Sequence, residues 1–184
     1  MSDSKYSFWK LINSYDIEIP MIQRDYAQGR NEGTVPYIRK NILSKLASAL
    51  NDEKLLDFDF IYGRIEEQPN KKPKLIPIDG QQRLTTLFLL HWYLANKDQV
   101  AQASIDVLNG FRYATRTSST EFCKALVKHP CAIPDKGPLS DTIKDYHWFF
   151  ASWEMDPTVA SMLVMLDAIH DKFADSLGLL AKIT

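Results

Sequence analysis

Residues 75–95 read Leu-Ile-Pro-Ile-Asp-Gly-Gln-Gln-Arg-Leu-Thr-Thr-Leu-Phe-Leu-Leu-His-Trp-Tyr-Leu-Ala, and this stretch decides which fold the sequence predicts. Residues 75–79 are typical of a short strand. Gly80 ends that strand, and the apolar side chains of residues 81–96 then recur on nearly every side of a helix. A helix that is apolar all round is buried. The stretch therefore predicts a strand that enters a central, buried helix through a tight turn.

The preceding residues extend this unit to a hairpin. Residues 58–65 are rich in strand-forming residues and largely apolar on both faces, which is typical of a central strand. A charged, proline-containing stretch at 66–73 separates them from the strand at 75–79 and predicts a turn. We therefore expect an antiparallel pair of strands.

The rest of the chain predicts mostly helices. We expect strands at 16–20 and 108–114, and helices at about 5–15, 36–51, 118–128, 139–152 and 157–174. In the helix at 36–51, the expected apolar stripe consists of Ile38, Ile42, Leu46 and Ala49. The last helix has the clearest beginning, because Asp156 suits the N-cap position and Pro157 suits the first turn. The predicted class is α+β. We expect one domain over residues 1–184, with a core at about 15–115 and a helical extension at about 116–184.

Composition excludes several classes of protein. The 22 Lys and Arg balance 23 Asp and Glu, so the chain carries no polybasic or acidic tail. The two cysteines, Cys123 and Cys131, form no disulfide framework and indicate free thiols in a reducing, cytoplasmic environment. The most apolar run, residues 87–95, is too short for a membrane span. The histidines lack metal-ligand spacing, and His91 is expected to be a core residue.

The turn at residues 79–83 is the strongest candidate site. The first N–H groups of the helix and its dipole favour an anion, and Gly80 permits close approach of a ligand to the backbone. Arg83 offers a guanidinium fork for phosphate oxygens, and Asp79 suits Mg²⁺ or a ribose hydroxyl. The alternative is structural: Asp79 caps the helix and Arg83 is its salt-bridge partner. Spacing alone leaves both interpretations open.

Two further polar stretches are candidates. Residues 19–30 place Gln23 and Arg24, which suit a phosphate or a base edge, close to Tyr26, which suits stacking on a base; the alternative is a solvated loop. Residues 111–116 alternate aromatic residues with arginine. That alternation suits nucleic acid, but an edge strand with charged outward side chains is the favoured interpretation.

Three motifs in this order resemble a known family. They are Ile-Pro-x-x-Gln-Arg-x-Tyr at 19–26, Phe-Ile-Tyr-Gly at 60–63, and Ile-Asp-Gly-Gln-Gln-Arg-Leu-Thr-Thr-Leu at 78–87. Together they look like the N-terminal DGQQR-motif domain of GmrSD-type, modification-dependent (type IV) restriction enzymes. The resemblance is close over about 15–95 and weaker over 111–113 and 153–158.

The resemblance implies a ParB/sulfiredoxin-like core with a small mixed sheet. It also implies a nucleotide-binding role in phage defence, with NTP hydrolysis as a further expected activity. It implies that a nucleoside triphosphate with Mg²⁺ contacts Asp79, Gly80, Gln81, Gln82 and Arg83, with Asp79 and Arg83 as the catalytic residues and Asp79 as the metal ligand. For the general base the sequence offers two carboxylates, Asp79 and Asp25. Gln23 and Arg24 would line the same pocket, and Tyr26 and Thr86 complete the expected nucleotide contacts.

The family resemblance also implies partners. Its members commonly continue into an HNH nuclease domain, whose His-Asn-His cluster this sequence lacks, so we expect an HNH nuclease domain or subunit as partner and no DNA cleavage by this chain alone. Two alternatives stay open. One is a DNA-binding module that senses modified DNA through Arg24, Arg30, Arg39, Lys40 and Lys45 without hydrolysis. The other is a structural partner domain of a nuclease.

Overall fold

The computed structural model describes residues 5–21, 25–52 and 56–183. In chain order its helices and strands are α1 (Phe8–Ser14), β1 (Asp16–Ile19), α2 (Val35–Asn51), β2 (Tyr62–Glu66), β3 (Lys74–Asp79), α3 (Gln81–Lys97), α4 (Gln102–Ile105), β4 (Phe111–Tyr113), α5 (Thr117–Lys128), α6 (Leu139–Lys144) and α7 (Pro157–Phe173). Three short 3₁₀ helices accompany them: η1 (Asp106–Gly110), η2 (Ala151–Met155) and η3 (Leu180–Lys182).

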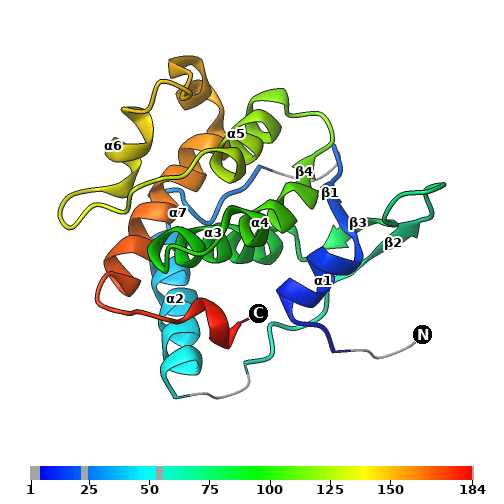
Figure 1. Cartoon of the computed structure of the whole chain (residues 1–184), viewed down its shortest axis with the longest axis horizontal. Coiled ribbons are helices and arrows are strands. Elements are labelled where there is room, and N and C mark those ends of the chain that lie inside the picture. The colour runs from blue at the N-terminus through cyan, green and yellow to red at the C-terminus, as the bar shows by residue number, and fades with distance from the viewer. Residues whose placement is uncertain (1–4, 22–24, 53–55, 184) are drawn as a thin grey trace.

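The four strands form one mixed sheet in the order β2-β3-β1-β4 (Figure 1). β1 pairs in parallel with both β3 and β4, whereas β2 pairs with β3 in antiparallel orientation. The predicted α+β class, the mixed sheet and the hairpin are therefore confirmed. Because β3, β1 and β4 are parallel, their carboxyl ends meet at one edge of the sheet.

The two faces of the sheet differ in chemistry. On the inner face, Phe111 of β4 stacks on Phe88 of α3 with ring centroids 4.7 Å apart. On the outer face, Glu18 of β1 accepts from Lys74 of β3 at 3.1 Å and from Arg112 of β4 at 2.7 Å. Burial alone would raise the pKa of Glu18, but these two cations lower it overall. Helices therefore cover one face, while ion pairs link the strands on the other.

Helix α3 is the centre of the helical layer (Figure 1). The Trp92 indole N–H donates to the Leu126 carbonyl of α5 at 2.6 Å, and the Tyr93 hydroxyl lies 3.1 Å from Nδ1 of His170 on α7. As predicted, His91 is buried. The beginning of α7 is also confirmed, because the Asp156 carboxylate accepts from the Thr158 N–H at 2.8 Å.

Three predictions about the elements are wrong. Residues 58–65 do not form a central strand: β2 begins only at Tyr62 and lies at the sheet edge, with Phe60 and Tyr62 exposed. The helix expected at 139–152 ends at Lys144, and η2 follows as a separate turn. In α2, Ile38 was expected to lie in the buried apolar stripe, but it is exposed. A neighbouring stripe of the helix packs against α7 instead and consists of Leu43, Leu46, Ala47 and Leu50.

Within the described ranges, none of the helices is long and apolar enough to cross a membrane.

Candidate functional site

The turn between β3 and α3 lies at the carboxyl edge of the parallel strands, where open α/β sheets commonly bind ligands. Gly80 adopts φ +93°, a left-handed conformation that suits glycine, and no side chain caps the helix that follows. Asp79 points its carboxylate into solvent with 74% of the side chain exposed. The alternative in which Asp79 caps α3 is therefore not the observed arrangement.

Arg83 holds the segment that precedes β2. Its guanidinium donates to the Phe58 carbonyl at 2.7 Å and to the Phe60 carbonyl at 2.8 Å. It also pairs with Asp79 at 3.1 Å and lies 3.7 Å from the carboxylate of Asp59. The salt bridge of the structural interpretation is therefore present. Two exposed carboxylates now flank one arginine, although the sequence had pointed to Asp79 alone.

Gln82 joins the two sequence motifs. Its side-chain oxygen accepts from the Ala27 N–H at 2.8 Å, and its side-chain nitrogen donates to the Asp25 carbonyl at 2.9 Å. This two-point contact holds residues 25–27 against the first turn of α3. The loop after β1 therefore packs against the turn after β3, and the expected lining of this turn by Gln23 and Arg24 stays a prediction.

Tyr26 and Thr86 lie beneath this site. The Tyr26 side chain is 1% exposed, and its hydroxyl lies 2.8 Å from that of Thr86. Thr86 is also buried, and its hydroxyl donates to the side-chain oxygen of Gln28. Burial raises the pKa of Tyr26 far above its usual value, so the phenol stays neutral. Neither side chain has accessible surface for a ligand. In this structure Tyr26 therefore does not stack on a base and Thr86 does not contact a nucleotide, because both pack beneath the loop.

Three helix beginnings hold residues 25–29. Besides Gln82 of α3, Arg116 at the start of α5 pairs with the Asp25 carboxylate, and the Thr158 hydroxyl of α7 accepts from the Tyr26 N–H at 3.3 Å. Gly29 packs so closely on α7 that a Cβ atom there would lie 1.7 Å from the Ser161 carbonyl oxygen. Only glycine fits this position, which explains the glycine in the predicted loop.

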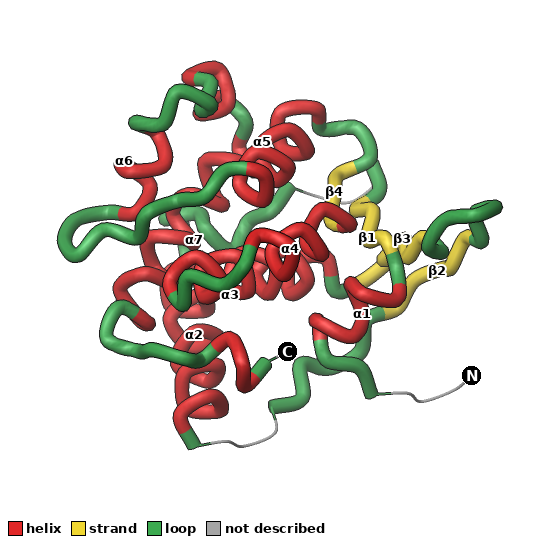
Figure 2. The backbone as a smooth tube through the Cα atoms, in the orientation of Figure 1, coloured by secondary structure: helices red, strands yellow, loops and turns green. Residues whose placement is uncertain are grey.

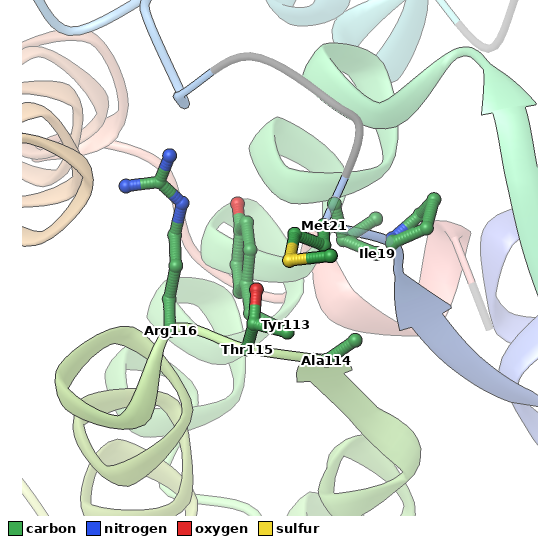
Figure 3. A pocket seen from close by; sticks show the side chains of 7 residues that line it. Ile19, Met21, Tyr113, Ala114, Thr115 and Arg116 are labelled. Atoms are coloured by element: carbon green, nitrogen blue, oxygen red, sulfur yellow. The ribbon is translucent and has the colours of Figure 1, made fainter.

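A shallow depression lies at the adjacent carboxyl ends of β1 and β4. It is lined by Ile19, Pro20, Met21, Tyr113, Ala114, Thr115 and Arg116. In Figure 3 the side chains of Tyr113 and Arg116 rise side by side, and the Arg116 guanidinium points toward the chain after β1. The Tyr113 hydroxyl lies 2.8 Å from that of Thr85, so this residue belongs to the inner packing. The edge-strand interpretation is confirmed for residues 111–113, which form β4 at the end of the sheet.

The remaining predicted residues differ in position. Gln81 is buried at the start of α3. Gln23 and Arg24 lie outside the described residues, although their neighbour Asp25 contacts the site. Of the arginines proposed for DNA, Arg39 donates to the Gln28 and Arg30 carbonyls and to the side chain of Asn31.

The described part of the chain holds no cluster of three or more potential metal ligands. One exposed carboxylate, Asp79, still fits Mg²⁺, because this ion is often held by one or two carboxylates together with substrate phosphates. Asp59 is a second carboxylate that the sequence reasoning missed. The signal for it was a lone acidic residue within the apolar run 58–65. It adopts a left-handed backbone conformation with φ +55°, which marks a turn and not a strand.

Fold and site together define an α+β domain with a candidate anion-binding turn at the carboxyl ends of its parallel strands. The chain belongs to the family described as "GmrSD restriction endonuclease, N-terminal domain", whose model matches residues 8–173. No curated protein and no solved structure gives a significant match. The chain is therefore a restriction-system domain, and its predicted relation to the ParB/sulfiredoxin-like core stays a prediction.

Proposed function

We propose that the turn formed by residues 79–83 binds the phosphates of a nucleoside triphosphate together with Mg²⁺, and that this binding regulates the restriction system. The observation that carries the proposal is the start of α3. A helix of 17 residues begins at a left-handed glycine without a side-chain cap, between the exposed carboxylate of Asp79 and Arg83. Backbone N–H groups and the helix dipole favour phosphate at such a position.

The side chains around the turn suit the parts of the ligand. A guanidinium carries five N–H donors, and the bonds to Phe58, Phe60 and Asp79 use three of those of Arg83. The remaining N–H groups of Arg83 would donate to phosphate oxygens. Asp79 would hold Mg²⁺, with Asp59 close by as a second carboxylate. When bound, Mg²⁺ would neutralise phosphate charge.

Hydrolysis is the further step of this proposal. Arg83 would stabilise the negative charge that grows on the phosphate oxygens in the transition state. Asp79 and Asp25 are the two candidates that the sequence offers for orienting the attacking water. Asp25 is the poorer of these, because its carboxylate is shared between Arg30 at 3.1 Å and Arg116.

The DNA-binding alternative has weaker support. Of its candidate cations, Arg30 pairs with Asp25, and Arg39 holds the loop at 28–31. Both therefore have partners within the protein, and the net charge of −1 adds no general attraction to DNA. Modified DNA and an HNH nuclease domain or subunit are proposed partners of the whole restriction system. If the protein binds no nucleotide, the alternative of a purely structural partner domain of a nuclease would be favoured.

The proposal is tested by isothermal titration calorimetry of the protein with each nucleoside triphosphate, with and without Mg²⁺. We expect one nucleotide at least to bind, and Arg83→Ala to weaken that binding about tenfold or more, since a charge-assisted contact contributes over 1 kcal/mol. Asp79→Asn should remove the Mg²⁺ dependence. Because Asp79 is largely exposed, this variant keeps the fold.

Arg112→Ala is the matched control. Arg112 is also an ion-paired arginine, but it belongs to β4, where it lies on the outer face of the sheet and contacts Glu18. The Arg112→Ala substitution should leave nucleotide affinity unchanged. Since Arg83 also holds residues 58–60, the urea denaturation curve of Arg83→Ala is measured beside its affinity. Absence of nucleotide binding by the folded wild type, or unchanged affinity of folded Arg83→Ala, would overturn the proposal.

A further inference from the structure

β2 forms an open edge of the sheet. It is the first strand in the order β2-β3-β1-β4, and β3 is its principal neighbour among the described elements. In Figure 2 the β2–β3 hairpin projects from the body of the molecule, away from the helical layer. An edge strand presents its outward backbone N–H and C=O groups as a template for another strand.

Apolar side chains gather along this edge. Phe60 is 80% exposed and Ile65 is 52% exposed, and neighbouring apolar residues are exposed as well: Ile61, Tyr62 and Ile78. Single exposed apolar residues are common, but several of them in and beside a strand with one unpaired edge indicate an interaction surface. The edge therefore offers both backbone hydrogen bonds and apolar area to a partner.

The charged residues of β2 identify that partner. Arg64 and Glu66 alternate with Ile65, lie on the same face of the strand, and pair with each other at 2.6 Å. When a second copy of the strand lies antiparallel beside the first and both are centred on the residue between the two charges, each positive side chain lies opposite a negative one. A strand of arbitrary sequence would instead meet an unmatched charge at one of these positions.

We propose that β2 pairs edge to edge with β2 of a second copy of this chain, antiparallel, with Ile65 on the two-fold axis. In this register Ile65 lies opposite the partner's Ile65, and Arg64 lies opposite the partner's Glu66. The two-fold axis repeats the ion pair, so the contact contains two of them. Opposite charges directly across an antiparallel pair stabilise it, and like charges destabilise it.

Neighbouring registers match the strand less well. Centring the pair on Arg64 sets this arginine against the partner's Arg64, which is a like-charge contact. Centring it on Gly63 places Glu66 opposite the partner's Phe60 and leaves the carboxylate without a cation across the interface. Charge complementarity therefore selects the register centred on Ile65.

The dimer does not require the nucleotide site. Antiparallel pairing of β2 joins the two sheets into eight strands, in which β3 of one copy runs opposite to β3 of the other. The two turns at residues 79–83 then lie at opposite edges of the joined sheet. A contact of one short strand per copy is small for an interface, so we expect a reversible, concentration-dependent dimer.

Cysteine cross-linking tests the register. Residues directly opposite in an antiparallel pair have Cα atoms about 4.5–5.5 Å apart, within the range of a disulfide. We expect Ile65→Cys to form a covalent dimer under mild oxidation of the folded protein, because the native Cys123 and Cys131 are buried. Glu67→Cys is the matched control. It is exposed on the same strand end, but this register sets it opposite the partner's Gly63, so it should cross-link far less.

Charge reversal tests the partner. Sedimentation velocity over a range of protein concentrations should give a dimer for the wild type, with Arg64→Glu and Glu66→Arg each weakening it roughly tenfold. The double variant Arg64→Glu, Glu66→Arg restores the complementary pattern and should restore the dimer. A wild type that stays monomeric at its highest soluble concentration would overturn the proposal. So would equal cross-linking at positions 65 and 67, or a double variant as weak as the single ones.

Discussion

Two largely apolar segments of this chain have opposite surroundings. Residues 87–95 of α3 are enclosed by other helices and by the inner face of the sheet, and Phe88 has no exposed surface. Residues 58–61 precede the edge strand β2, and residues 62–65 belong to it. Phe60 in the first part and Ile65 in the second are exposed to solvent. Both segments were predicted to be buried. Burial therefore depends on the position of a segment in the sheet order as well as on its composition.

The reason is topological. α3 follows β3 and packs against α7, α1, α4 and η3, and its Phe88 stacks on Phe111 of β4. Among the described strands, β2 pairs with β3 and with no other, whereas β3 lies between β2 and β1. A strand at that position has one free side whatever its side chains are. The two regions should therefore respond very differently to the same substitution.

The largest effect is expected for Phe88→Ala. The substitution removes a fully buried ring that stacks on Phe111, and it leaves a cavity that the surrounding helices fill only in part. Core Phe→Ala changes typically cost about 3–5 kcal/mol of unfolding free energy. Urea denaturation followed by circular dichroism would measure this. A loss below about 1 kcal/mol would mean that α3 is not the packed centre described here.

An intermediate effect concerns His91, which α3 buries. Burial lowers the pKa of His91 to about 4, whereas a histidine in the unfolded chain titrates near its usual 6.5. As the pH falls from 7 to 5, the His91 imidazole becomes protonated in the unfolded state but stays neutral in the folded state. Unfolding free energy should therefore fall by about 2 kcal/mol from this residue.

His91→Gln removes the titrating group, so its urea denaturation curves at pH 7 and pH 5 should differ less than those of the wild type. The exposed His147 serves as the control, because His147→Gln should keep the full pH dependence. Equal pH dependence in the wild type and in His91→Gln would contradict the burial of His91 as a neutral imidazole.

The smallest effect is expected for Phe60→Ala, the same substitution at the exposed segment. The ring is mostly in solvent, so its removal should change the unfolding free energy by no more than about 0.5 kcal/mol. The measurement is thermal or urea denaturation at low protein concentration, where self-association does not contribute. If Phe60→Ala lowered the unfolding free energy by nearly as much as Phe88→Ala, the two regions would not differ in burial as described.

Local signals in the sequence were reliable where short-range chemistry decides the structure. Asp156 and Pro157 begin α7 as predicted, because a side-chain cap and a proline act within one helical turn. Gly80 breaks β3 and begins α3 for the same reason. The stripe of α2 was misjudged at Ile38, since the side of a helix that becomes buried depends on where its neighbours lie.

For the candidate site, the sequence named the turn, and the structure supplied the contacts. Gln82 had been expected to meet a ligand, yet its side chain binds the backbone of residues 25–27. Tyr26 had been expected to stack on a base, yet it is buried against Thr86. Residue type shows what a side chain can bind, but several partners of the right chemistry compete for it within a folded protein.

The sequence by itself determined the α+β class, the hairpin, the strand–turn–helix unit around Gly80 and the membership in the restriction endonuclease family. These follow from local backbone preferences and from motifs contiguous in the chain. Only the tertiary structure decided that β2 lies at an edge, that Arg83 holds residues 58–60, and that three helix beginnings meet at residues 25–29. Such features depend on contacts between residues far apart in sequence, and these contacts form only when the elements pack together.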